Sequence, residues 1–409
     1  MTWQMLKTPL YGIILDDKYS ITSMNNSNKN KTKIYICYAD AGGGHKSVAN
    51  ALKGNIMANY SGLADIELAN IANDYGDFFL KNIGKFYGMC IKRFPLIWEF
   101  GFVKLYTRHP RIGDIFLRIA WTRYGKFIKE FIDNNPADAY ISTIHIYGYF
   151  LSKYREVTKK DFKIITVVTD ISYLGFFWVN KHHDLIILPT EECKTNGKKL
   201  IEKYNVGSVT RILGLPIDER YYSNTFTHNN KKSNSGLKIL IATGGEGSNA
   251  IWDLCKKLNE LNDQSISIEV SVGRNAKLAE KINSFKWKTN ITAFGWIPSL
   301  IEKYQTIDLV ITKAGPTTIW ECMAMDKPMI IYSYIKGQED GNKEFAMKRS
   351  RAIYEEDFDK IAALIKNIAK LGTEKSFPYP PSYSKEFAAT NWTAKVCKEI
   401  IDFILNSQE

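Results

Sequence analysis

Two successive loops in the second half of the chain carry residue types that bind a phosphorylated ligand. The segment Lys313–Glu321 reads Lys-Ala-Gly-Pro-Thr-Thr-Ile-Trp-Glu and directly follows an apolar run at 307–312. A helical pattern begins after Gly315 and Pro316. The first N–H groups of a helix have no partner within it, so they would face an anion. This arrangement can hold a diphosphate without a metal ion.

The residues around this helix start supply donors and acceptors for a nucleotide-linked sugar. Glu321 stands one turn into the predicted helix, where its carboxylate can accept hydrogen bonds from a ribose hydroxyl pair. The second loop, Gly337–Asn342, adds the mixed donors and acceptors that suit a hexose. An ordinary helix start with a first-turn acid is the alternative, but the joint spacing of the loops favours a binding site. The predicted donor-binding residues of both loops are Gly315, Pro316, Thr317, Thr318, Glu321, Gln338, Glu339 and Asn342.

A glycine-rich turn near the start of the chain is the second candidate for chemistry. The segment Tyr38–Lys46 reads Tyr-Ala-Asp-Ala-Gly-Gly-Gly-His-Lys. Gly43 and Gly44 would let the backbone approach a substrate closely, and His45 would face the cleft with a pKa near the working pH. A purely structural turn is the alternative. Asp170 follows a predicted strand and is a second candidate base, although a helix cap or a loop brace would also explain it.

These segments resemble, in the same order, the signatures of the monogalactosyldiacylglycerol synthase and processive diacylglycerol glucosyltransferase family. The likeness also includes Val167–Asp170, Gly244–Gly247 and Phe294–Trp296, and it extends over roughly residues 33–405. It implies an α/β chain of GT-B fold, with two Rossmann-like doubly wound domains, a central cleft, and a C-terminal helix that crosses back to the first domain. It also implies a UDP-sugar substrate, inversion at the anomeric carbon, and no required cofactor or metal.

The resemblance implies roles for particular residues. His45 would lie near the acceptor hydroxyl as a base or an orienting group, with Asp170 as a possible partner. The loop at 244–248 would border the donor phosphates, although a tight turn explains its glycines equally well. The loop at 294–298 would present backbone groups to the uracil ring. The further donor-binding residues predicted on these grounds, with Arg274 as a phosphate-pairing or stacking candidate, are Gly244, Gly245, Glu246, Gly247, Arg274, Trp296 and Ile297.

One loop departs from the family pattern. Many members carry a histidine shortly before the tryptophan that follows the Thr-Asp pair. Here residues 171–178 read Ile-Ser-Tyr-Leu-Gly-Phe-Phe-Trp, without a histidine. The departure argues against this loop as the source of the base and indicates a changed acceptor pocket.

The elements that must position these residues follow from the apolar runs. The predicted strands are 33–38, 139–144, 164–168, 185–188, 238–242, 266–272, 307–311 and 328–331, and helices are predicted at 47–59, 250–261 and 384–405. Two α/β units place a ligand cleft between the carboxyl ends of both sheets. The predicted organisation is a mobile segment at 1–32, an acceptor domain at 33–222, a UDP-sugar domain at 237–383 and a returning helix at 384–409.

Composition narrows the class of protein. The 409 residues are 45% hydrophobic and 24% charged, which is typical of a folded globular chain of two domains. Six scattered cysteines form no Cys-x-x-Cys pair, so we expect reduced thiols and neither zinc nor a disulfide framework. No apolar stretch approaches the roughly 20 residues of a spanning helix, and no signal peptide is evident. Membrane contact should therefore be peripheral, at the cytoplasmic face.

The net charge of +12 is concentrated in one region. Between Lys81 and Lys129 there are eleven Lys or Arg against two acids, interleaved with aromatic residues. This pattern suits the interface of an anionic bilayer, although a core helix pair with a solvated basic face is the alternative. No nucleic-acid motif accompanies the charge, so we predict no nucleic-acid partner. The predicted acceptor or membrane residues are Gly43, Gly44, Arg93, Trp98, Phe102, Arg108 and Trp121.

Together these features predict a glycosyltransferase that moves a hexose from UDP-galactose or UDP-glucose to a membrane lipid. Diacylglycerol is the favoured acceptor, and anionic lipid is a candidate activator. Two alternatives remain open: transfer of N-acetylglucosamine to an undecaprenyl-linked acceptor, and a peripheral membrane protein that binds a nucleotide without catalysis. A Rossmann dehydrogenase is disfavoured because Gly-Gly-Gly-His-Lys lacks the Gly-x-Gly-x-x-Gly spacing.

Overall fold

The apolar runs of the sequence form two parallel β-sheets, each of six strands. The computed structural model describes residues 31–40, 43–82, 89, 110–222, 236–244, 250–381 and 383–407. The chain divides into a unit at Met1–Lys31 and a compact unit at Thr32–Glu409. The predicted mobile segment lies almost wholly outside the described residues, and the predicted domain boundaries stay predictions.

The first sheet has the order β2-β1-β3-β4-β5-β6, and every neighbouring pair is parallel. Its strands are β1 (Thr32–Cys37), β2 (Ala64–Ala69), β3 (Ala139–Ser142), β4 (Lys163–Val167), β5 (Leu185–Leu188) and β6 (Thr210–Ile212). The helices of this half are α1 (Gly44–Tyr60), α2 (Ile71–Asp74), α3 (Phe78–Lys81), α6 (Pro110–Asn134), α7 (His145–Thr158), η2 (Phe176–Trp178), α8 (Glu191–Tyr204) and η3 (Glu219–Tyr222).

The second sheet has the order β12-β11-β10-β7-β8-β9 and is also parallel throughout. Its strands are β7 (Leu237–Ala242), β8 (Ile266–Ser271), β9 (Asn290–Phe294), β10 (Leu309–Lys313), β11 (Met329–Ser333) and β12 (Ala352–Tyr354). The remaining helices are α9 (Ala250–Asn259), α10 (Ala276–Ser284), α11 (Ile301–Thr306), α12 (Pro316–Ala324), α13 (Asp340–Arg349), α14 (Phe358–Leu371), α15 (Thr373–Ser376), α16 (Lys385–Ala389) and α17 (Trp392–Asn406).

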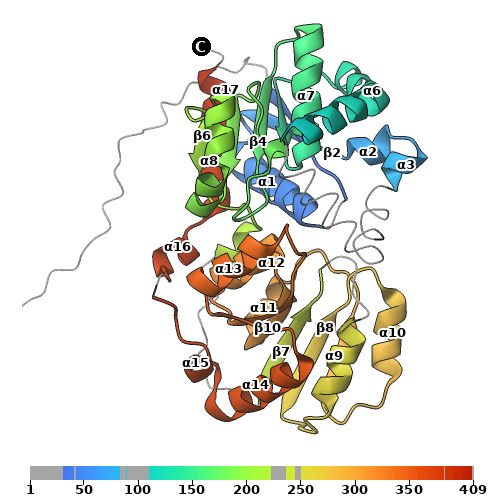
Figure 1. Ribbon diagram of the computed structural model, residues 1–409, viewed down its shortest axis with the longest axis vertical. Helices are drawn as coiled ribbons and strands as arrows, with labels where there is room; N and C mark the ends of the chain where they lie inside the picture. Colours follow the sequence, from blue (N-terminus) through green and yellow to red (C-terminus); the bar gives the residue numbers. More distant parts are fainter. Residues whose placement is uncertain are drawn as a thin grey trace, which may run out of the picture. The chain divides into compact units, whose positions relative to one another are not determined.

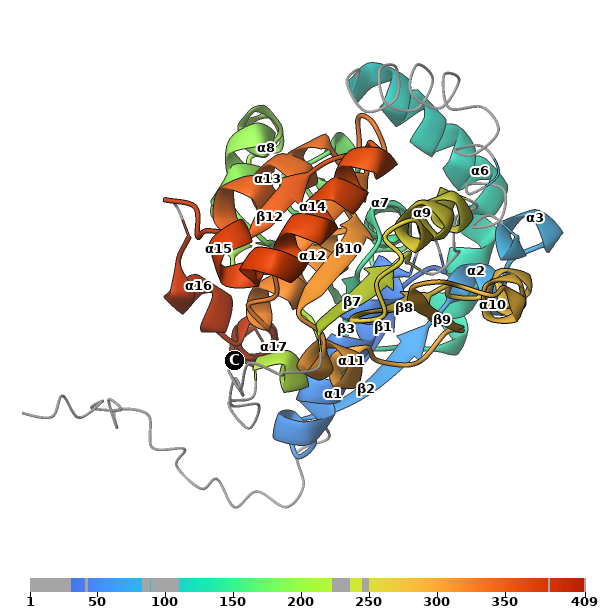
Figure 2. The same ribbon diagram turned by 90° about the horizontal axis from the view of Figure 1, so that it is seen from below.

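Successive side chains of a strand point to opposite faces of the sheet. In the central strands both sets are apolar, and helices cover both faces of each sheet (Figure 1, Figure 2). In β1, Ile34 and Ile36 face α1 and α17, whereas Tyr35 and Cys37 face α6 and α7. In the second sheet one face packs on α9, α10 and α14, and the other on α11, α12 and α13. Both faces of each sheet are therefore buried, as parallel strands require. The predicted fold class, two Rossmann-like halves, is confirmed.

The C-terminal segment returns to the first half, as predicted, but as two helices. Asn391 interrupts the helical pattern because its side chain accepts a hydrogen bond from the Ala394 N–H and caps the start of α17. Helix α17 then packs on α1, and Thr393 Oγ1 accepts the Ile217 N–H at 2.9 Å. Figure 1 shows α17 in red against the half that carries α1.

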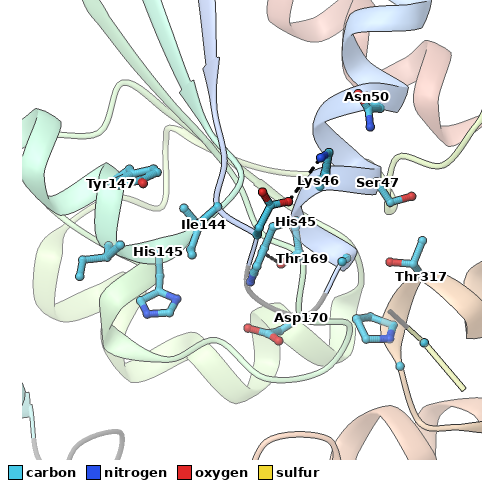
Figure 3. A pocket seen from close by; sticks show the side chains of 18 of the residues that line it. His45, Lys46, Ser47, Asn50, Ile144, His145, Tyr147, Thr169, Asp170 and Thr317 are labelled. Carbon is cyan, nitrogen blue, oxygen red and sulfur yellow. Dashed lines mark hydrogen bonds and ion pairs between the residues drawn. The ribbon is translucent and has the colours of Figure 1, made fainter. Parts of the chain in front are cut away.

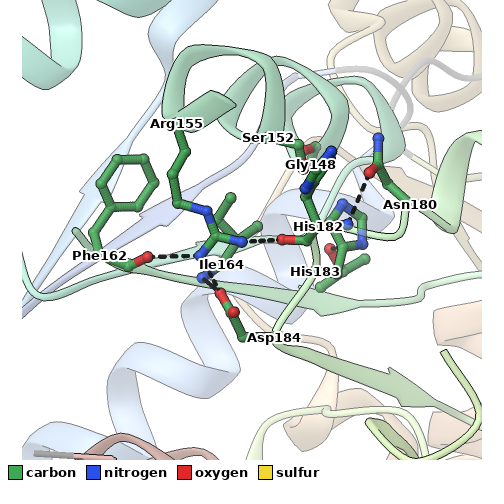
Figure 4. Close-up of polar contacts among 10 residues, drawn as sticks. Gly148, Ser152, Arg155, Phe162, Ile164, Asn180, His182, His183 and Asp184 are labelled. Atoms are coloured by element: carbon green, nitrogen blue, oxygen red, sulfur yellow. Dashed lines mark hydrogen bonds and ion pairs between the residues drawn. The ribbon is translucent and has the colours of Figure 1, made fainter. Parts of the chain in front are cut away.

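Helix α7 is held in place by hydrogen bonds of the partly buried Arg155 (Figure 4). Arg155 donates to the Phe162 carbonyl at 2.8 Å, to the Asp184 carboxylate and to the His182 carbonyl. The same carboxylate accepts the Ile164 N–H at 2.7 Å. These bonds tie the end of α7 to β4 and to the turn before β5, and they thereby fix the helix that begins at His145.

Within the ranges that the structure describes, no helix is long and apolar enough to span a bilayer. The five cysteines in those ranges are buried free thiols. No group of three or more His, Cys, Asp or Glu side chains there is arranged to hold a metal ion.

Candidate active site

A cavity of about 1370 Å³ opens at the carboxyl ends of the central strands of both sheets. In a doubly wound sheet this edge is where loops from neighbouring strands converge and ligands bind. The loops that follow β1 and β4 line it from the first half, and those that follow β7, β8, β10 and β11 line it from the second half. The cleft predicted between two Rossmann-like halves is therefore present.

Most of the predicted site residues within the described ranges line this cavity. They are Gly43, Gly44, His45, Asp170, Gly244, Arg274, Trp296, Ile297, Gly315, Pro316, Thr317, Thr318, Glu321, Gln338 and Glu339. Asn342 and Trp121 do not line it. The remaining predicted residues, Gly245, Glu246, Gly247, Arg93, Trp98, Phe102 and Arg108, lie outside the described residues.

His45 is the first side chain of α1 and is oriented from behind by the ends of two strands (Figure 3). Its Nδ1 lies 2.8 Å from the Thr143 carbonyl oxygen and 3.0 Å from Thr169 Oγ1. A carbonyl oxygen can only accept, so Nδ1 carries the proton and Nε2 keeps a lone pair. Burial lowers the pKa of His45 to about 4, although the Thr143 bond opposes the shift. His45 is thus a neutral imidazole at pH 7, able to accept a proton.

Asp170 lies after β4 on the same side of the cavity. Its Oδ2 accepts the indole N–H of Trp178 at 2.8 Å, which fixes the loop at 171–178 against the cavity wall. Burial raises the pKa of Asp170 to about 6, and the charge of Glu339 across the cavity adds to the shift. The hydrogen bond from Trp178 supports a loop-bracing role for Asp170. Its raised pKa is also consistent with a role as a base.

His145 lines the same part of the cavity and was not singled out in the sequence (Figure 3). It begins α7, and its ring lies 5.1 Å from that of Phe177 and 5.6 Å from that of Trp178. Burial, with a contribution from His45, lowers the pKa of His145 to about 3. Its position just beyond β3, at the carboxyl edge of a central strand, was the signal that could have identified it.

The donor-side loops form a helix start without a side-chain cap. Gly315 is the N-cap residue of α12 and Pro316 is its first residue, and no side chain bonds to the free N–H groups. Glu321, one turn later, accepts the Tyr304 hydroxyl at 3.2 Å. Burial raises the pKa of Glu321 to about 8, and the Tyr304 bond opposes the shift. An open helix N-terminus and a carboxyl group with a raised pKa therefore lie on the same side of the cavity, which we call the donor wall.

Glu339 and Asn342 differ in what they contact. Glu339 pairs with Lys313, with its Oε1 3.0 Å from the ammonium nitrogen, and its Oε2 accepts the Ile335 N–H at 2.9 Å. Asn342 is buried, and its amide donates to the Ala314 carbonyl at 3.2 Å. That bond braces the turn before Gly315. Direct contact of Asn342 with a sugar stays a prediction that this placement does not favour.

Other cavity residues bridge or border the two halves. Arg274 extends from the loop after β8, and its guanidinium lies 4.0 Å from the Asp40 carboxylate of the first half. Trp296 is 57% exposed at the mouth of the cavity, next to Ile297. A second ion pair between the halves joins Arg349 to Glu192 at 2.7 Å. Ion pairs therefore connect the two halves in addition to the apolar packing between them.

One arm of the cavity is apolar and reaches the outer surface of α6. Phe79, Phe116 and Ile119 line this arm and are respectively 46%, 51% and 62% exposed. Tyr124 and Phe127 lie further along the same lining. Trp121 is not part of the lining and packs edge-on against the lining residue Phe150, with 5.8 Å between ring centroids. The polar centre of the cavity is thus continuous with an exposed apolar helix face.

Comparison with known proteins matches both halves of the chain. Residues 45–217 match the monogalactosyldiacylglycerol synthase family, and residues 238–396 match the glycosyltransferase family 28 C-terminal domain. Monogalactosyldiacylglycerol synthase 2 of Arabidopsis thaliana is 23% identical over 84% of this chain and 75% of its own length. The processive diacylglycerol beta-glucosyltransferase of Bacillus pumilus is 25% identical over 86% of this chain and 90% of its own length.

Solved structures agree on the fold. MurG of Acinetobacter baumannii has a TM-score of 0.50 at 9% identity and covers 92% of this chain and 99% of its own. The MnaA–UDP complex of Staphylococcus aureus has a TM-score of 0.54 at 11% identity and covers 92% of this chain and 97% of its own. The paired sheets, the cavity between them and the family matches on either side of it lead to one assignment. The chain therefore joins a monogalactosyldiacylglycerol synthase domain in its first half to a glycosyltransferase family 28 C-terminal domain in its second half.

Proposed function

We propose that this enzyme transfers galactose or glucose from the UDP-sugar to diacylglycerol at a membrane surface, with inversion at the anomeric carbon. The observation that carries the proposal is the continuity of the cavity. The exposed face of α6, His45 and the uncapped start of α12 all line this one cavity. A lipid acceptor and an anionic donor can therefore meet at one imidazole. The names of the relatives support the same pair of substrates.

The donor would occupy the second half of the chain. The N–H groups at the start of α12 would bind the diphosphate, where the helix dipole also favours negative charge. Glu321 would accept the ribose hydroxyls, and Gln338 and Glu339 would bind the hexose. The loop at Trp296 and Ile297 would border the uracil ring, with Arg274 near the phosphates. Backbone and side-chain groups of this chain would thus stabilise the charge that develops on UDP as it leaves.

The acceptor hydroxyl would lie at His45 Nε2. As the lipid oxygen attacks the anomeric carbon, its proton passes to Nε2 and the bond from that carbon to the phosphate oxygen breaks with its electron pair on UDP. Attack from the face opposite the leaving group gives the inverted glycoside. Thr143 and Thr169 keep the imidazole in the tautomer that can accept this proton. Asp170 would orient the acceptor loop through Trp178, or accept the proton in place of His45.

Membrane contact would come from α6 and α3. Phe78 is 78% exposed and Ile115 is 58% exposed, close to the exposed lining residues Phe116 and Ile119. Arg118 and Arg123 are exposed on the same helix. Exposed apolar side chains beside cations suit the boundary of an anionic bilayer, where each nearby cation contributes about 1 kcal/mol. Peripheral binding at this face would place the apolar arm against the lipid.

The test is a transfer assay with purified protein and liposomes of phosphatidylcholine and phosphatidylglycerol, with or without diacylglycerol. Radiolabelled UDP-galactose and UDP-glucose are supplied separately and the lipids are resolved. We expect one donor to label a lipid only when diacylglycerol is present. Liposomes with an undecaprenyl-linked acceptor and UDP-N-acetylglucosamine form the comparison arm. Label in that arm alone would replace the acceptor that we propose, and label in no arm would contradict transfer to either lipid.

A further inference from the structure

Lys313 lies on the donor wall of the cavity, and neither the sequence motif nor the proposed function gives it a role. It is the last residue of β10, and it lines the cavity with its side chain 33% exposed. The pairing of β10 with β11 shifts register between Thr312 and Lys313, from Thr312–Ile331 to Lys313–Ser333. Irregularities of this kind redirect side chains at the ends of strands. Here the shift occurs at a residue that lines the cavity.

The stem of Lys313 passes between the two glycine turns of the donor wall. A Cβ atom at Gly244 would lie 3.4 Å from Lys313 Cε, and one at Gly315 would lie 3.7 Å from the same atom. These are ordinary van der Waals distances, so the lysine stem lies directly against both turns. Gly315 is also the N-cap of α12, so the ammonium group and the free helix N–H groups belong to one small region. Two sources of positive potential face the same space.

Among the residues that the structure describes, Glu339 is the acid that pairs with the ammonium group. Glu339 Oε1 lies 3.0 Å from Lys313 Nζ, and the Ile335 N–H satisfies Glu339 Oε2. The carboxylate is only 5% exposed, whereas the lysine is one-third exposed. The lysine side chain thus keeps a third of its surface exposed, and both residues line the cavity although the acid is largely buried. An anion can reach Lys313 without displacing Glu339 from the Ile335 N–H.

We propose that Lys313 binds the diphosphate of the donor and neutralises the leaving group, while its pairing with Glu339 orients the carboxylate that contacts the hexose. This assignment rests on the proposed function and goes further by naming the cation that the donor wall supplies. An ammonium group is a mobile point charge, so it can retain Glu339 and contact a phosphate oxygen at once. It would lower the barrier to departure of UDP because its charge acts where negative charge develops.

Binding of UDP, UMP and uridine to the wild type, K313M and K313R tests the assignment. Isothermal titration calorimetry gives the affinities, and circular dichroism confirms that each variant is folded. Loss of a charged hydrogen bond to phosphate should weaken UDP binding about tenfold to a hundredfold in K313M. UMP binding should weaken less, uridine binding should not change, and K313R should retain most of the UDP affinity. Equal weakening of UDP and uridine, or no weakening of either, would overturn the assignment.

E339Q is the matched control, because a lysine that acts only by positioning Glu339 would give K313M and E339Q the same phenotype. We expect E339Q to keep or strengthen UDP binding, since it removes the acid that competes for Lys313, and to weaken UDP-sugar binding. Identical losses in both variants would reduce Lys313 to a positioning residue. If the wild type bound neither UDP nor uridine, the proposed function itself would be contradicted. UDP binding by the wild type with an unchanged K313M would overturn the role of Lys313 alone.

Discussion

On the acceptor wall of the cavity, burial keeps His45 and His145 uncharged at pH 7 and raises the pKa of Asp170. On the donor wall, Lys313 and Glu339 form an ion pair beside an open helix start. The acceptor wall therefore holds the groups nearest the acceptor that can take up a proton, whereas the donor wall places a cation and free helix N–H groups side by side, with the titratable Glu321 further along the same helix. The difference separates the two needs of glycosyl transfer, a base for the acceptor and a positive field for the leaving group.

The largest effect should follow from removal of the acceptor-wall base. We expect H45A to lower kcat about 10²-fold to 10⁴-fold, the usual contribution of a general base, with UDP affinity unchanged. Transfer assays and calorimetry on the same preparation give both quantities. A variant that lost UDP affinity in proportion to kcat would show that the walls are not independent.

The pH profile distinguishes His45 from Asp170 as the base. Either group acts when deprotonated, so activity is lost as pH falls through the pKa of the group that is used. Because the pKa of His45 is about 4 and that of Asp170 about 6, kcat/KM for diacylglycerol at saturating donor should stay level from pH 7 to 5 if His45 is the base. The matched variant D170N, which can still accept from Trp178, should show the same profile. A decline below pH 6 that disappears in D170N would assign the base to Asp170.

The donor wall has its own pH signature in Glu321. Its pKa is about 8 in the empty site, and the ionised carboxylate is the better acceptor for two ribose hydroxyls. Binding should therefore release a proton, and uridine affinity should rise about tenfold between pH 6.5 and 8. Uridine is the appropriate probe because it carries no phosphate that titrates in this range. E321Q should bind uridine more weakly and without this pH dependence, and a wild type without it would remove Glu321 from the ribose site.

The sequence predicted the centre of each sheet and missed its edges. The eight strands expected from apolar runs are the central ones, and the four that were missed, β2, β6, β9 and β12, are the edge strands. Strand β2 alternates buried and exposed residues, and β12 is three residues long. A strand with one neighbour needs no continuous apolar run, so it gives little signal. The ends of the central strands were nevertheless enough to locate the cavity.

Site residues were predictable where a turn and a helix start coincide, as at His45 and Gly315. They were less predictable where the tertiary fold decides the contact. Lys313 was the first residue of the donor segment but received no role from the sequence, and its ion pair to Glu339 becomes visible only in the structure. Asn342 lies in the second loop, yet its amide bonds to the Ala314 carbonyl behind the cavity wall. Sequence spacing identified the loops but not the direction of each side chain.

The smallest effect should come from moving one wall against the other without altering either chemistry. Gly341 of α13 contacts the first half, and a Cβ there would collide with Ser172 Oγ. G341A should therefore displace the donor loop from the acceptor loop and lower kcat/KM about threefold to tenfold, since small misplacements at an active site are costly. S172A alone should behave like the wild type, and the double variant should recover much of the loss because the hydroxyl is gone. If G341A has full activity, the contact between these loops does not set the distance between the walls. If the double variant is as impaired as G341A, the loss arises within α13 itself.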